Sequence, residues 1–254
     1  MSFVVAGIAP HPPIAIPEIG GRELLKLDNT VKALEKLSQL FVDNEVRTLV
    51  LISPHGPLQS DALVIQGQEQ LSGSFARFGR PDISLTYPGD TALARLVQEE
   101  AERAGIKTYL WDDDPFDALD HGALVPLYYL NKAGFKGKLL HVTFAFLPFM
   151  QLMRFGRLLR DCLQKIDEAG GILASSDLSH MLVRGAPAGY HPDGTRFDRE
   201  LVGAISRGKV EDILNFDPSM VENAGECGLR SILILLGAVT EEGFKPTVYS
   251  YEGP

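Results

Sequence analysis

The chain has 254 residues, of which 45% are hydrophobic and 22% charged, and this ordinary globular usage excludes disorder or a fibrous repeat as its main state. Its net charge of −9 argues against a general nucleic-acid binder and against attachment to an anionic membrane surface. No Cys-x-x-Cys pair occurs, so we expect no cysteine zinc knuckle and no disulfide framework. The apolar start lacks a basic segment, and no apolar run reaches the roughly 18 residues of a membrane helix. We therefore expect a cytoplasmic protein.

Apolar runs and helical spacings alternate along the first half of the chain. The apolar run that begins it stops at Pro10, and the second run stops at Ser53. Asp90 is a suitable N-cap and Gly105 a suitable stop for the helix between them. In chain order, this half predicts a strand over 3–9, a helix over 29–44, strands over 46–52 and 62–67, and a helix over 90–104.

The second half continues the alternation. It predicts a helix from 119–123 to about 130, a strand over 138–144, a helix over 149–168, a strand over 172–175, helices over 197–207, 209–214 and 226–238, and a last strand over 247–251. This alternation predicts a three-layer α/β/α sandwich around a mixed, largely parallel central sheet. Since no linker or repeat divides the chain, we predict a single domain over residues 1–254.

Three histidines follow predicted strands by a few residues. They are His11, His55 and His180. Parallel strands bring such positions to one edge of the sheet, where ligands bind in α/β folds. Each of them could instead cap a neighbouring carbonyl group, but three in corresponding positions indicate a metal or catalytic site. Prolines beside His11 and His55 stiffen the backbone, which suits metal ligands.

The other three histidines have weaker claims to function. His121 lies between Asp120 and Gly122, where it either begins a helix or serves in substrate binding and acid–base chemistry. His141 lies inside a predicted strand, and we expect a structural role for it. His191 lies in a Gly/Pro-rich loop that could close over a substrate.

A metal site needs a further ligand, and the best local candidates are two neighbours. Glu226 with two histidines would make the 2-His-1-carboxylate triad of non-haem Fe(II) oxygenases. Glu226 could equally be a helix N-terminal carboxylate. Cys227 could bind a softer metal, or be a small buried residue.

Other catalytic patterns are absent from the sequence. It contains no G-x-S-x-G, no G-x-x-x-x-G-K-[ST], no G-x-G-x-x-G and no H-E-x-x-H motif. Ser176, Asp177 and His180 could suggest a hydrolase triad, but such groups usually come from separate segments.

The histidine motifs, taken in order, resemble those of the LigB superfamily, which includes the class III extradiol ring-cleavage dioxygenases and the Memo-like proteins. The resemblance covers about residues 5–240. A stretch over residues 71–79 is similar to the bacterial Memo-like branch. The motifs that carry it are Ala9-Pro10-His11-Pro12-Pro13, Ser53-Pro54-His55-Gly56, Leu119-Asp120-His121-Gly122, Ser175-Ser176-Asp177-Leu178-Ser179-His180 and Gly225-Glu226-Cys227-Gly228.

The resemblance implies a LigB-like fold and a mononuclear non-haem iron. It implies His11, His55 and Glu226 as metal ligands, His180 as the acid–base residue and His121 as a second histidine of the substrate pocket. In Memo-like proteins a cysteine lies near the position of Cys227, so the third ligand stays open between Glu226 and Cys227.

Three hypotheses about function follow. The first is an Fe(II)-dependent extradiol-type dioxygenase that opens the ring of a catechol-like substrate with O₂, with His180 as acid–base. The second is a Memo-like metal- or redox-binding protein without ring cleavage, and the third is a non-enzymatic binding module of the same fold. We expect Fe(II), with zinc or copper as alternatives. The expected partners are a small aromatic substrate and O₂, with no nucleic acid and no membrane, and the sequence is compatible with a homo-oligomer.

Overall fold

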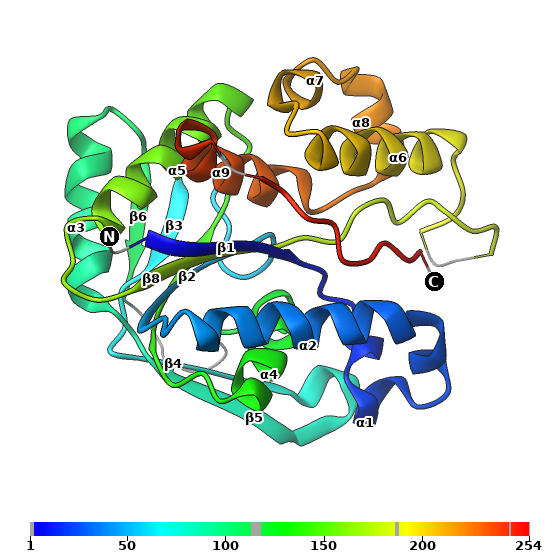
Figure 1. Cartoon of the computed structure of the whole chain (residues 1–254), viewed down its shortest axis with the longest axis horizontal. Helices are drawn as coiled ribbons and strands as arrows, with labels where there is room; N and C mark the ends of the chain where they lie inside the picture. Colours follow the sequence, from blue (N-terminus) through cyan, green and yellow to red (C-terminus); the bar gives the residue numbers. More distant parts are fainter. Residues whose placement is uncertain (1–2, 113–117, 186–187, 244, 254) are drawn as a thin grey trace.

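The computed structural model describes residues 3–112, 118–185, 188–243 and 245–253, and its centre is a six-stranded sheet (Figure 1). All neighbouring strands in this sheet are parallel except β7 and β3, so the predicted mixed, largely parallel sheet is confirmed. The strands, in spatial order, are β1 (Phe3–Ala9), β8 (Gly170–Ser175), β2 (Thr48–Ser53), β7 (Lys138–Thr143), β3 (Leu63–Gln66) and β6 (Thr108–Trp111).

Helices cover both faces of the sheet (Figure 1). One core contains residues of α2 (Asp28–Asp43) and α4 (His121–Ala133), and the other contains residues of α3 (Thr91–Arg103), α5 (Phe149–Leu163) and α9 (Leu229–Val239). The central strand β2 is buried along its whole length and sends alternate side chains into the two cores. This is the pattern of a strand covered on both faces, and it explains the continuous apolar run in its sequence.

Smaller elements complete the chain. A hairpin of β4 (Gln70–Phe75) and β5 (Arg80–Pro88) packs beside α4 and forms a second, two-stranded sheet. The remaining helices are α1 (Pro17–Gly20), α6 (Pro192–Ser206), α7 (Val210–Leu214) and α8 (Pro218–Ala224), with 3₁₀ turns at Pro13–Ala15, Glu23–Leu27, Ala76–Phe78 and Thr240–Glu242. Among the described residues, no helix is both long and apolar enough to cross a bilayer.

Several predicted boundaries were wrong. The predicted helix 149–168 ends at Leu163, where the amide of Lys165 donates to the carbonyl of Cys162 and so tightens the last turn. The predicted helix 197–207 begins earlier, at Pro192, because Pro192 supplies its first position and the His191 ring accepts from the amide of Asp193.

The predicted strand over 247–251 was also wrong. This segment runs in an extended form past the edge of β1 but makes no strand ladder. Its polar side chains bond instead to the helices on either side, through Ser250, Tyr251 and Glu252.

Two glycines let α5 and α9 pack backbone against backbone. A methyl group at Gly156 of α5 would lie 1.8 Å from the carbonyl oxygen of Ile234 in α9. A methyl group at Gly237 of α9 would lie 2.1 Å from the carbonyl oxygen of Met153 in α5. Because the atoms that these methyl groups would meet belong to the backbone, the two helices could not make room by a local adjustment. This close crossing therefore fixes the position of α9 relative to α5.

We predict that Gly156→Ala lowers the free energy of unfolding by about 1–3 kcal/mol or more, because the helices must separate. The matched control is Gly203→Ala in α6, where the added methyl would meet the end of the flexible Arg207 side chain at 3.0 Å. That control should be neutral, or stabilising by up to about 1 kcal/mol through helix propensity. Urea unfolding of both variants measures the difference, and equal stability of the two would contradict the close packing.

Candidate metal centre

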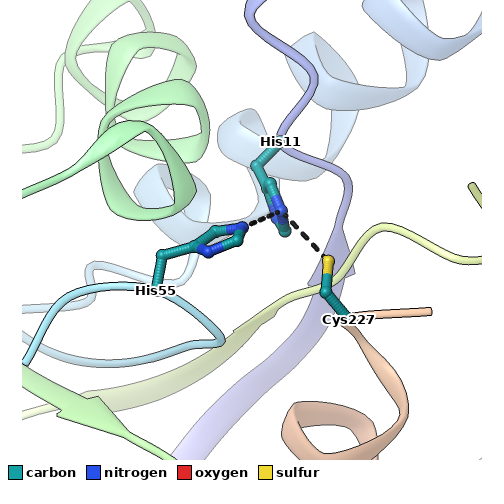
Figure 2. A group of neighbouring side chains, drawn as sticks. All are labelled: His11, His55 and Cys227. Carbon is teal, nitrogen blue, oxygen red and sulfur yellow. Dashed lines mark hydrogen bonds between the residues drawn. The ribbon is translucent and has the colours of Figure 1, made fainter. Parts of the chain in front are cut away.

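The ends of three parallel strands place two histidines side by side. Ala9 at the end of β1 pairs with Ser175 at the end of β8, and β8 pairs with β2 on its other side. His11 and His55 each follow their strand by two residues, and their Nε2 atoms are 3.2 Å apart. The Sγ atom of Cys227 lies 3.5 Å from Nε2 of His11 (Figure 2). The donor atoms of these three residues all lie within 4.8 Å of one another.

Hydrogen bonds fix the orientation of His11. Its Nδ1 lies 2.9 Å from the hydroxyl oxygen of Ser175, and that hydroxyl donates its own proton to the carbonyl of Gly122. The Ser175 oxygen therefore accepts from Nδ1–H, and Nε2 keeps the lone pair that faces Cys227 and His55. The backbone amide of His11 also donates to the carboxylate of Asp177 at 2.7 Å.

Burial keeps the two imidazoles neutral. The pKa of His11, which is 1% exposed, falls well below its ordinary value because of burial, with further lowering by the neighbouring His55, His121 and His180. Burial also lowers the pKa of His55, against the opposing charge of Asp120. Neutral imidazole is the form that binds metals, so both rings are in the ligating state at pH 7.

A short loop between α8 and α9 delivers Cys227. The loop begins at Gly225, whose φ of +57° favours glycine, and it passes close to the end of β8 at Gly228. A methyl group on Gly228 would lie 2.6 Å from the carbonyl oxygen of Asp177, so this approach also requires glycine. The Cys227 thiol points at that carbonyl over 3.7 Å, and burial raises its pKa to about 12.

Glu226 faces away from this group. Its carboxylate accepts a hydrogen bond of 2.5 Å from the amide of Leu229, in the first turn of α9, and lies 3.6 Å from the Arg230 guanidinium. Its side chain is 4% exposed, and burial raises its pKa. The structure therefore gathers His11, His55 and Cys227, the alternative that the sequence left open, while Glu226 has the geometry of a helix-terminal carboxylate.

His180 and His121 lie next to the three donors, His180 beside Cys227 and His121 beside His55. The backbones of Ser179 and Glu226 form an isolated antiparallel β-bridge. The residues that follow them, His180 and Cys227, are therefore neighbours, and Nε2 of His180 lies 3.8 Å from Sγ of Cys227. His121 is the first residue of α4, which Asp120 caps, and its ring centroid lies 4.4 Å from that of His55. His11, His55 and His180 thus meet in one place, as the sequence predicted for strand ends, and His121 joins them from the start of α4.

The other two histidines and the second cysteine lie outside the group. His141 is fully buried in β7, its ring nitrogens have no hydrogen-bond partner among the described residues, and burial lowers its pKa to about 4, which agrees with the structural role expected for it. His191 caps α6, where its ring also lies 3.5 Å from the Asp193 carboxylate. Cys162 is buried inside α5.

The three donors fit a bound metal ion. For tetrahedral coordination with bonds of about 2.0–2.1 Å to nitrogen and about 2.3 Å to sulfur, neighbouring donors lie about 3.3–3.6 Å apart. The separations of 3.2 Å between His11 and His55 and of 3.5 Å between His11 and Cys227 are close to this, and the third pair, His55 and Cys227, lies within 4.8 Å. Imidazole suits zinc, copper and iron, whereas a thiolate favours zinc and copper(I) over a hard cation such as magnesium.

Three supporting residues were missed by the sequence reading. Ser175 orients His11, and the strand register that makes it a neighbour of Ala9 could have identified it. Phe78, whose ring centroid lies 5.5 Å from that of His121, and Arg77, whose charge helps to lower the His121 pKa, come from the unpredicted hairpin. The signal that could have found them is the likeness of residues 71–79, which include both, to the Memo-like branch.

Comparisons with known proteins found matches over most of the chain. Residues 6–254 match the family model described as the catalytic LigB subunit of aromatic ring-opening dioxygenase. The chain is 21% identical over 259 residues to 3,4-dihydroxyphenylacetate 2,3-dioxygenase of Escherichia coli, with 97% of this chain and 93% of that protein aligned.

Two further relatives carry no described activity. The chain is 35% identical over 252 residues to Protein CA_C1420 of Clostridium acetobutylicum, and the match covers 97% of this chain but 54% of that protein. It thus spans about half the length of that relative. The crystal structure of the uncharacterized protein JW3007 from Escherichia coli K12 superposes with a TM-score of 0.57 at 19% identity, over 80% of this chain and 81% of the other. This likeness confirms the fold.

We predict that Ser175→Ala weakens metal binding about 10- to 100-fold, because the ring of His11 loses the partner that fixes its tautomer and orientation. The control is Ser231→Ala, at a buried serine whose hydroxyl has no hydrogen-bond partner among the described residues. Competition titration with a chromophoric chelator measures both affinities. Equal affinities in the two variants would show that Ser175 does not orient the ligand.

Proposed function

This chain belongs to the LigB family of catalytic subunits of aromatic ring-opening dioxygenases, and from that membership we propose that it is a metal-dependent dioxygenase of the extradiol type acting on a catechol-like substrate. The observation that carries the proposal is the convergence of three donor atoms within 4.8 Å, flanked by two further histidines, at the edge of the sheet where this fold binds ligands.

His11, His55 and Cys227 would hold the metal. Two of them are neutral imidazoles whose Nε2 atoms face each other, and the third is a thiol that a metal ion would deprotonate. A bound metal ion would act as a Lewis acid, lower the pKa of a coordinated substrate hydroxyl and hold the substrate for reaction with O₂.

His180 would be the acid–base residue. Its Nε2 lies beside the donor group without belonging to it, so the ring can accept a proton from a substrate hydroxyl and return it later. His121 would help to hold the aromatic ring, because its imidazole and the Phe78 side chain form an aromatic wall next to His55.

A second candidate function rests on the identity of the third donor. Cys227, and not a carboxylate, lies with the two histidines, and Glu226 is engaged at the start of α9. A His-His-Cys set departs from the 2-His-1-carboxylate triad and suits copper or zinc as well as iron. This observation favours a Memo-like metal- or redox-binding protein that has kept the pocket without ring cleavage.

The ligand set generates a direct prediction. Cys227→Ser should weaken metal binding by at least about 100-fold, because it replaces the soft donor with a hydroxyl that binds these metals poorly. Glu226→Gln is the matched control one residue away. It should change metal affinity by less than about threefold, because the carboxylate points at Leu229 and Arg230. A loss of metal with Glu226→Gln and none with Cys227→Ser would reverse the assignment of the third ligand.

The activity generates a second prediction. Protein loaded anaerobically with Fe(II) should consume O₂ with a catechol panel and form a coloured ring-opened product. His180→Ala should lower kcat by about 10²–10⁴-fold while iron binding is retained, since an acid–base residue is lost and no ligand is. His191→Asn, which can still cap α6, is the control and should keep full activity. Absence of O₂ uptake at full iron occupancy would reject ring cleavage and favour the second candidate.

A further inference from the structure

A long cavity of about 1390 Å³ lies along the outer edge of β1, away from β8. Aliphatic side chains of β1, α2, α6 and α9 form much of its wall. On the α2 side, Ala33, Leu37 and Leu40 remain half-exposed inside it. Because β1 has seven residues at about 3.3 Å each, a cavity that follows its length extends over about 20 Å.

The C-terminal segment 245–253 forms a roof over this cavity. Figure 1 shows the segment, in red, passing between α2 and α6. On the α2 side, the Glu252 carboxylate accepts from the amide of Thr30 and from the side chain of Asn29, each at 2.8 Å. On the α6 side, the Tyr251 hydroxyl donates to the Asp198 carboxylate at 2.6 Å. These bonds tie the two helical layers together across the edge of β1.

One end of the cavity reaches the candidate metal centre. Its lining there includes Asp177, Ser179 and His180. Asp177 accepts from the amide of His11, and His180 lies 3.8 Å from Cys227. A molecule that fills the cavity therefore ends beside His180, close to the donor group.

We propose that this cavity binds a single extended hydrocarbon chain, the tail of an amphiphilic molecule whose polar head lies at His180. The lining along β1, α2 and α9 is mostly aliphatic, which favours a hydrocarbon chain. Two of its charged residues, Asp198 and Glu252, are already hydrogen-bonded by Tyr251 and Thr30. Segment 245–253 crosses the cavity and bonds to Thr30 and Asp198, so the half-open space beneath it suits a narrow chain better than a folded partner. That the polar head is a catechol rests on the proposed function. The site for the hydrocarbon chain is inferred from the cavity and does not depend on that function.

The test uses 4-alkylcatechols with methyl, butyl, octyl and dodecyl chains, below their micelle concentrations, titrated by calorimetry into the metal-loaded protein. Affinity should increase about three- to fourfold per buried methylene until the cavity is filled. Ala33→Trp fills the cavity from the α2 side and should abolish this dependence on chain length. Gln39→Trp adds the same side chain on the exposed face of α2 and should leave the dependence unchanged.

Val202→Phe, on the α6 wall, repeats the test from the opposite side should Ala33→Trp fail to fold, as judged by circular dichroism. Equal affinity for short and long chains in the wild type would overturn the proposal, as would an unchanged chain-length dependence in a folded filled variant. O₂ uptake is recorded in parallel. Chain-dependent binding without turnover would retain the cavity site and reject ring cleavage, whereas turnover with chain-independent affinity would reject the cavity site alone.

Discussion

Parallel pairing of β1, β8 and β2 aligns the carboxyl ends of these three strands, and His11, His55 and His180 follow those ends. The register sets Ser175 next to Ala9, and the Ser175 hydroxyl then fixes the ring of His11. A shift of one residue in β8 would send the Ser175 side chain to the opposite face of the sheet and leave His11 without its partner. The orientation of the first donor thus follows from backbone hydrogen bonds far from any metal.

The charged groups around these strand ends favour a bound cation. Asp120 and Asp177 lie next to the imidazoles, and the rings themselves are kept neutral by burial. Burial raises the pKa of Asp177 to about 6, although the hydrogen bond from the His11 amide and the charge of His180 lower it, so the charge of this carboxylate is costly unless a positive group is near. The overall charge of −9 has the same sign as these local groups, so the site does not repel cations at long range.

Five of the six strands of the sheet, most helices and the meeting of His11, His55 and His180 could be predicted from the sequence, because each depends on local patterns, whereas the short edge strand β6 was not predicted. Strand β2 was predictable from its unbroken apolar run, and His55 from its position after it. The third donor was not, because Glu226 and Cys227 are neighbours and the turn at Gly225 decides which side chain faces His11. The hairpin that brings Phe78 to His121 was missed, although the alternation of Ile83, Leu85 and Tyr87 along its second strand is typical of a half-buried strand.

The crossing of α5 and α9 at Gly156 and Gly237 has a consequence for the three donors, which differ in how far each can move. Cys227 precedes a helix that is locked against its neighbour, and His11 is held through both its ring and its backbone. His55 lies on a loop where its amide bonds to the hydroxyl of Ser53, and its ring has no comparable anchor among the described residues. Metal ions of different radius would therefore be accommodated by displacement of His55, so the loop after β2 is the part of the donor group that can adjust while His11 and Cys227 stay fixed.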